Sequence, residues 1–162
     1  MKAMDYERIF TRYIDTVYRV ALNGCKNVSD AEDIVQNTFV KLMESSSIFE
    51  DDEHIRKWLI RVTVNECKSL WRNPWKKRRV EIENINEPVF STPERSALYY
   101  AVRDLPPKYR EVVYLYYFEE FSIKEIADVM GISETAIQTR LQRARQKLKN
   151  MLGGYGNEQR NA

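Results

Sequence analysis

The stretch FSIKEIADVMGISETAIQTR, residues 121–140, predicts a short helix, a glycine turn and the beginning of a longer helix. Ser122 and Glu125 have the spacing of a capping box, which satisfies free amides at the start of a helix. Gly131 can adopt the left-handed conformation that ends such a helix, and Ser133 can cap the next one. The pattern therefore predicts a helix-turn-helix, whose second helix ends at Gly153-Gly154.

The second helix of this motif has two distinct faces. Its apolar side includes Ile137, Leu141, Ala144 and Leu148, which we expect to be buried. The opposite face is polar and basic, and residues 138–150 contain five basic side chains and no acid. A helix of this kind fits the major groove of DNA, where residues near its N-terminus reach base edges.

We therefore predict that the polar face binds duplex DNA. Glutamine can pair with adenine, and arginine with guanine, through two hydrogen bonds each. Base reading is assigned to Gln138, Thr139, Gln142 and Arg143, and phosphate contacts to Arg140, Arg145 and Lys147. The competing interpretation is an ordinary amphipathic helix with a basic outer face.

Hydrophobic spacing predicts helices in the rest of the chain as well. The first covers about residues 6–23, a capping-box pattern at Ser29–Glu32 opens the second, and the third covers about residues 54–72. Pro93 and Pro107 suit the first positions of two further helices. The inward sides of these two helices are predicted to hold Leu98, Ala101, Val102 and Leu105, followed by Tyr109, Val112, Val113, Tyr116 and Tyr117. The fold class is therefore all-α.

The net charge of +2 hides a strong segregation of charge. Residues 28–53 contain eight acids and one lysine, whereas residues 54–80 contain nine basic residues and only Glu66 as an acid. Residues 54–80 and the basic face of the last helix, at residues 138–150, therefore form two separate cationic blocks. Two such blocks favour two contacts with a polyanion over two solvated helix faces.

The first basic block combines a helical face with an aromatic loop. Arg61, Asn65, Lys68 and Arg72 step by four, three and four residues, which places them on one side of the third helix. The loop that follows interleaves tryptophan with basic residues, namely Trp71, Trp75, Lys76, Lys77, Arg78 and Arg79. Aromatic platforms among cations are suited to unpaired nucleotides. Alternatively, Trp71 ends the core of this helix and Trp75 packs over it.

An acidic, proline-interrupted stretch divides the chain. From Glu81 to Glu94 it contains four glutamates, no basic residue, and both Pro88 and Pro93, so we predict a flexible linker. The predicted organisation is a helical domain at 1–78, a linker at 79–94, a helix-turn-helix domain at 95–153 and a disordered tail at 154–162.

Several classes of function lack the residues they would need. Cys25 and Cys67 are far apart, and His54 is the only histidine, so no metal site, cofactor site or disulfide is predicted. There is neither a phosphate-cradling glycine loop nor a cluster of carboxylates, so we expect no enzymatic activity and no small-molecule substrate. No signal peptide and no membrane-spanning run is apparent, and a cytoplasmic location is expected.

Four segments taken in order resemble the extracytoplasmic-function (ECF) sigma factors, group 4 of the sigma-70 family. They are DAEDIVQNTF (30–39), WLIRVTVN (58–65), LPPKYREV (105–112) and RLQRAR (140–145). The resemblance covers almost the whole chain. It implies a region 2-like domain followed by a region 4-like domain, in a protein that binds bacterial core RNA polymerase and promoter DNA. It also implies regulation by an anti-sigma factor.

The resemblance further implies roles for individual surfaces. Asp33, Gln36 and Asn37 match the family's contacts to the clamp helices of the polymerase largest subunit, and Lys41 lies on the same side. The face from Arg61 to Arg72 and the loop to Arg79 resemble the part that opens the −10 element. The last helix resembles the reader of the −35 element.

The alternative class is a free-standing helix-turn-helix regulator, which would bind an operator tightly without polymerase. The tryptophan-rich basic loop argues against it, because a protein that binds only duplex DNA has little use for stacking platforms.

Overall fold

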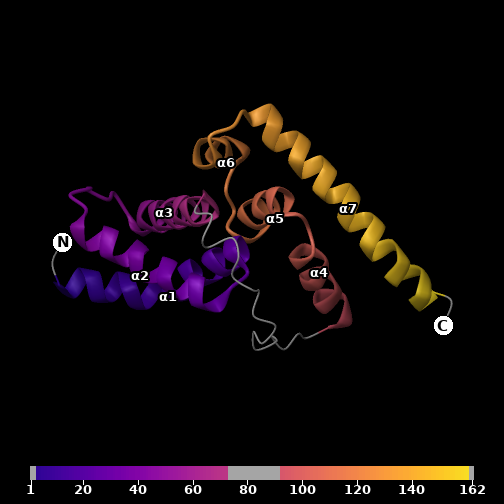
Figure 1. Cartoon of the computed structure of the whole chain (residues 1–162), viewed down its shortest axis with the longest axis horizontal. Helices are drawn as coiled ribbons and strands as arrows, with labels where there is room; N and C mark the ends of the chain where they lie inside the picture. Colours follow the sequence, from indigo (N-terminus) through magenta and orange to yellow (C-terminus); the bar gives the residue numbers. More distant parts are fainter. Residues whose placement is uncertain (1–2, 73–91, 161–162) are drawn as a thin grey trace. The chain divides into compact units, whose positions relative to one another are not determined.

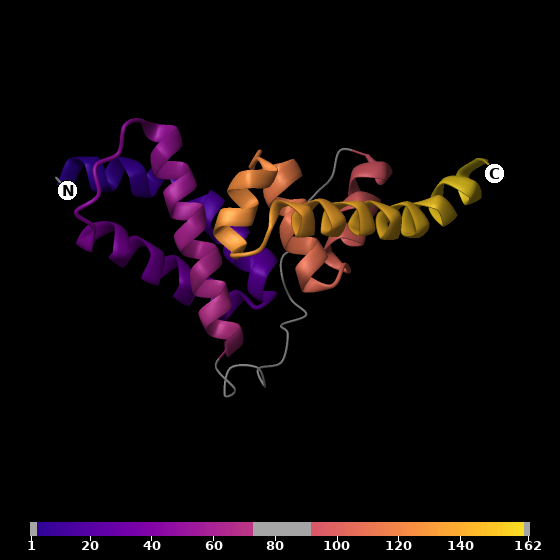
Figure 2. The ribbon, with the colours of Figure 1, turned by 90° about the horizontal axis from the view of Figure 1, so that it is seen from above.

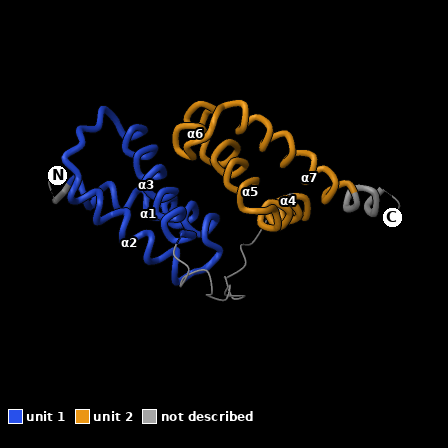
Figure 3. The backbone as a smooth tube through the Cα atoms, turned by 45° about the horizontal axis from the view of Figure 1, so that its top comes forward, with its two compact units in different colours: residues 1–85 blue, residues 86–162 orange. Residues whose placement is uncertain are grey.

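The computed structural model describes residues 3–72 and 92–160, and within these ranges the chain forms helices and no strands. It divides into two compact units, residues 1–85 and residues 86–162 (Figure 3). The predicted all-α fold with two small helical domains is confirmed. Of the predicted linker, residues 79–91 lie outside the described residues, as do Trp75, Lys76, Lys77, Arg78 and Arg79.

The described residues of unit 1 form three helices, α1 (Ala3–Cys25), α2 (Val28–Glu44) and α3 (Asp52–Arg72) (Figure 1). α3 lies across the other two, as Figure 2 shows. Their facing apolar sides form a core of Ile9, Tyr13, Val17, Val35, Phe39, Leu42, Ile55 and Leu59. A second cluster lies near the end of α1 and contains Ala21, Cys25, Ala31, Ile34 and Cys67.

The start of α2 differs from the prediction. The helix begins at Val28, and its cap is Asn27, whose Oδ1 accepts a hydrogen bond of 2.9 Å from the amide of Asp30. Ser29 therefore lies inside the first turn, and the predicted capping box at 29–32 is wrong. Asparagine is as good a cap as serine, and the extended backbone of Asn27 suits that role.

Unit 2 contains α4 (Pro93–Arg103), α5 (Pro107–Val113), a π-helical turn (Tyr114–Phe118), α6 (Ile123–Met130) and α7 (Glu134–Arg160). α4, α5 and α6 all pack against α7. The predicted helix-turn-helix is present as α6 and α7. Both hydrogen bonds of the Ser122–Glu125 capping box form, each at 3.1 Å, and Gly131 has a φ of 70°.

The π-helical turn corrects the predicted inward side of this region. Tyr117 was expected to face the core, but it is 50% exposed, whereas Leu115 is buried. A π-helical turn accommodates one more residue than an α-helical turn, so the pattern of inward positions shifts along the chain. Leu98 in α4 is also exposed rather than buried.

α7 is longer than predicted. Its backbone remains helical to Arg160, past Gly153-Gly154, so the predicted helix end is wrong and the predicted tail overlaps the helix. Glycine inside a helix costs about 1 kcal/mol relative to alanine, which weakens a helix but does not stop one that is already formed.

Candidate nucleic-acid interface

The outer face of α7 carries most of the residues predicted to bind duplex DNA. Ile137, Leu141 and Ala144 are fully buried against the rest of unit 2, which fixes the rotation of the helix. The side chains left on the outside are Gln138, Gln142, Arg143, Arg145 and Lys147, which are exposed, and Thr139 and Arg140, which are half-buried. The Oγ of Ser133 caps the helix by accepting a hydrogen bond of 3.1 Å from the amide of Ala136.

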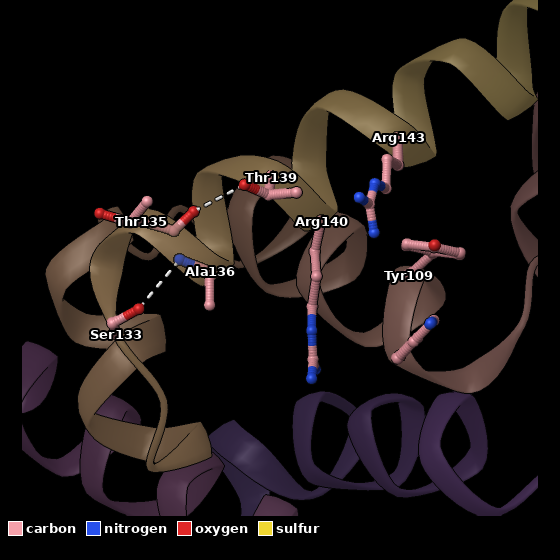
Figure 4. A pocket seen from close by; sticks show the side chains of 8 residues that line it. Tyr109, Ser133, Thr135, Ala136, Thr139, Arg140 and Arg143 are labelled. Atoms are coloured by element: carbon pink, nitrogen blue, oxygen red, sulfur yellow. Dashed lines mark hydrogen bonds between the residues drawn. The ribbon is translucent and has the colours of Figure 1, made fainter.

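A groove lies between this part of α7 and the beginning of α5. Its volume is about 430 Å³, and it is lined by Lys108, Tyr109, Ser133, Thr135, Ala136, Thr139, Arg140 and Arg143. Figure 4 shows Arg140 and Arg143 projecting from α7 on the same side, with Tyr109 of α5 facing Arg143. Cations and hydroxyl groups together are suited to a phosphate.

Lys108 and Tyr109 are residues that sequence reasoning did not place at the interface. The ammonium of Lys108 lies 5.0 Å from the centre of the Tyr109 ring, and that of Lys147 lies 5.7 Å from it. Burial alone would raise the pKa of Tyr109, but the positive charges of Lys108 and Arg143 outweigh it, and the pKa lies below its usual 10.0. The shift follows from the charges and hydrogen bonds of Lys108 and Arg143, which line the groove beside the phenol.

Arg145 is held differently from the other cations of α7. Its Nε donates a hydrogen bond of 2.6 Å to the hydroxyl of Tyr117, and its guanidinium lies within 6 Å of the ring centres of Tyr116 and Tyr117. Tyr117 can make this contact because the π-helical turn places its side chain outside the core. Arg145 therefore also ties α7 to the segment before α6.

The predicted −10 face lies along α3. Arg61, Asn65 and Arg72 are exposed and Lys68 is half-buried, so the four side chains lie on the accessible side of the helix as predicted. Trp71 combines the two interpretations considered above. It is 42% exposed, and its Nε1 donates a hydrogen bond of 3.1 Å to the carbonyl oxygen of Gly24.

The face of α2 that was predicted to contact the polymerase is accessible. Asp33, Gln36, Asn37 and Lys41 are all exposed. Lys41 forms an ion pair with Glu66 of α3, and the Nδ2 of Asn37 donates a hydrogen bond of 3.5 Å to the same carboxylate. Glu66 therefore contacts two of the four residues, Asn37 and Lys41. The distribution of charge along the sequence could not reveal these contacts.

Two exposed apolar side chains of α2 were missed by the sequence analysis. Val40 is 49% and Met43 59% exposed. Because they follow Gln36 by four and seven residues, they continue its side of the helix. The signal was present in the sequence, because Val40 and Met43 lie off the stripe formed by Ile34, Val35, Phe39 and Leu42.

Two further properties bear on the class of protein. Within residues 3–72 and 92–160, no group of three or more His, Cys, Asp or Glu side chains could hold a metal ion. No helix in these ranges is both long enough and apolar enough to span a membrane.

A helix-turn-helix with a basic outer face defines a DNA-binding protein, and comparisons with known proteins identify which kind. Residues 9–77 match the family model described as "Sigma-70 region 2", and residues 95–148 match "Sigma-70, region 4". The chain belongs to the ECF group of sigma-70 family RNA polymerase sigma factors.

Individual relatives agree with this assignment. The ECF RNA polymerase sigma factor SigM of Bacillus subtilis is 30% identical over 156 residues, which cover 90% of this chain and 94% of the relative. RNA polymerase sigma factor CarQ of Myxococcus xanthus is 28% identical, covering 91% of this chain and 89% of CarQ.

Solved structures share the fold. The sigma factor RpoE from Bartonella quintana, in complex with the anti-sigma factor NepR, aligns with a TM-score of 0.74 at 22% identity and covers 92% of this chain and 97% of that chain. CnrH, in complex with the cytosolic domain of CnrY, aligns with a TM-score of 0.63 at 26% identity and covers 94% of this chain and 90% of that chain.

Proposed function

We propose that this sigma factor binds core RNA polymerase through α2, helps to open the −10 element with α3, and reads the −35 duplex with α7. The observation that carries the proposal is the division of the exposed polar side chains among these three helices. Each helix buries its apolar side within its own unit and leaves a chemically different face accessible.

The face of α7 is suited to intact duplex DNA. Gln138, Thr139, Gln142 and Arg143 are near the N-terminal half of the helix, where a major-groove helix reaches bases. We assign phosphate contacts to Arg140, Lys147 and, from the groove beside them, Lys108. Arg145 has a second, structural role, because the hydroxyl of Tyr117 already accepts its Nε–H group.

The face of α3 is suited to single-stranded DNA. Arg61, Asn65, Lys68 and Arg72 supply charge and hydrogen bonds along one side of the helix, and the exposed part of Trp71 offers a surface for stacking. Trp75, Lys76, Lys77, Arg78 and Arg79 extend this role in the proposal, although they lie outside the described residues.

The face of α2 is suited to a protein partner. Asp33, Gln36, Asn37 and Lys41 share the exposed side of α2 with Val40 and Met43, and a mixture of polar and apolar groups is typical of protein interfaces. We propose that this face docks on the largest subunit of the polymerase, where Val40 and Met43 supply the apolar contact.

We also propose that an anti-sigma factor regulates the chain. The support is the likeness of fold to RpoE, whose structure contains the anti-sigma factor NepR. In this proposal the protein acts inside the cell together with polymerase and promoter DNA, and it catalyses no reaction itself.

In vitro transcription with purified core polymerase on a library of promoter fragments tests the proposed function. We expect transcripts that depend on the added chain and start at a shared pair of −35 and −10 sequences. Tight binding to duplex operators without polymerase, and no dependent transcripts, would instead favour a free-standing regulator.

A further inference from the structure

Glu66 is the only acid in the basic block of residues 54–80, and it lies where α3 meets α2. Its side chain is 14% exposed, whereas that of its partner Lys41 is 54% exposed. One carboxylate oxygen pairs with Lys41, and the other accepts the hydrogen bond from Asn37. A single carboxylate therefore holds two side chains that are one helical turn apart on α2.

This contact continues a polar seam between the two helices. Thr38 lies between Asn37 and Lys41 on α2, and Thr63 lies one turn before Glu66 on α3; their hydroxyl groups share a buried hydrogen bond of 3.5 Å. The hydroxyl of Thr63 also donates a hydrogen bond of 2.7 Å to the carbonyl oxygen of Leu59. The Thr38–Thr63 contact and the Glu66–Lys41 ion pair therefore join the same sides of the two helices.

We propose that Glu66 is a positioning residue, which orients Lys41 and Asn37 for the polymerase. It also neutralises the charge of Lys41 where the exposed side of α2 (the docking face) borders the exposed side of α3 (the DNA face). This inference rests on the proposed docking role of α2. Without Glu66, the long Lys41 side chain would sample many rotamers, and the polymerase would have to order it on binding.

The same carboxylate has the opposite effect on DNA. It lies two residues before Lys68 in the chain, beside the exposed face of α3 that carries Arg61, Asn65, Lys68 and Arg72. Its removal increases the positive potential there, and affinity for a nucleic-acid backbone rises with positive charge. Loss of Glu66 should therefore weaken the contact with polymerase and leave the contact with single-stranded DNA unchanged or stronger.

The test compares Glu66→Gln with Glu53→Gln in the full-length protein. Glu53 is also on α3, but it pairs with Arg56 of the same helix, so both variants lose one negative charge and one ion pair. Three quantities are measured for each: affinity for purified core polymerase, affinity for a labelled single-stranded oligonucleotide carrying the −10 sequence, and melting temperature.

For Glu66→Gln we expect polymerase affinity to fall by about two- to fivefold, the range for an exposed ion pair. Oligonucleotide affinity should be equal or higher, and Glu53→Gln should leave polymerase affinity unchanged. Unchanged polymerase affinity in Glu66→Gln, an equal loss in both variants, or a parallel loss of both affinities and of melting temperature would overturn the inference. If the unmodified protein failed to bind core polymerase, the proposed function itself would be wrong.

Discussion

Gly24 illustrates how closely the helices of unit 1 pack at the level of a single residue. A Cβ atom added there would lie 2.7 Å from the Sγ and 3.2 Å from the Cβ of Cys67. The first distance is too short for a real contact, so the Cys67 side chain or one of the two helices would have to shift. Gly24 is thus required by close approach of a neighbour and not by an unusual backbone angle.

We predict that Gly24→Ala destabilises the protein by about 1–3 kcal/mol, as overpacking typically does. The control is Gly153→Ala in α7, where an added Cβ meets nothing within 4 Å. That variant should gain up to about 1 kcal/mol from helix propensity. Denaturant unfolding measures both, and combining Gly24→Ala with Cys67→Ala should recover part of the loss. No recovery would place the cause elsewhere.

Tyr109 makes the groove sensitive to alkaline pH. Its pKa is lowered, so its phenolate forms below the usual 10.0 and places a negative charge next to the proposed phosphate. The affinity for −35 duplex should therefore fall as the pH rises through the lowered pKa toward 10.0. Tyr109→Phe should bind as well at neutral pH and lose less affinity at alkaline pH. Anisotropy titrations across pH check this, and identical profiles would refute it.

The same pKa shift affects stability in the opposite direction. A folded-state pKa below the unfolded one means that the folded protein favours the ionised phenol. Free protein should therefore gain stability relative to Tyr109→Phe as the pH rises through the lowered pKa toward 10.0. Ultraviolet difference spectroscopy follows the phenolate directly.

At the scale of an element, α7 should separate base reading from phosphate binding. Arg143→Ala should cost about 1–3 kcal/mol at one base pair of the −35 element and relax selectivity there. Lys147→Ala should weaken binding to all sequences alike and lower the salt slope by about 1. Binding assays on a panel of single-base variants at several salt concentrations distinguish the two. A uniform loss for Arg143→Ala would make it a phosphate contact.

The elements also show what sequence could and could not predict. The capping box at Ser122, the turn at Gly131 and the buried positions Ile137, Leu141 and Ala144 follow from local rules and were predicted correctly. Leu148, which was also expected to be buried, is only half-buried. The π-helical turn was not predictable, because the shifted positions of Leu115 and Tyr117 depend on packing against the rest of unit 2. The sequence showed Glu66 only as the single acid in a basic block. Its contacts with Asn37 and Lys41 could not be predicted, because these residues are far away in the sequence.

For the whole molecule, we propose that docking on polymerase and binding of the −35 duplex belong to different units. Replacing both Gln36 and Asn37 by alanine should weaken binding to core polymerase, because both side chains are exposed on the docking face and their loss leaves the core intact. Competition binding with labelled protein measures this effect. The affinity of the free protein for −35 duplex should stay the same, and a loss of both would indicate misfolding.

The two cysteines of the chain, Cys25 and Cys67, are both buried in unit 1. A thiol-reactive dye can reach them only when that unit opens, so the rate of labelling reports its local opening free energy. The two native cysteines therefore report on the opening of unit 1, which we propose binds the polymerase. The decrease in their labelling rate upon addition of core enzyme would measure how much binding stabilises unit 1 against opening.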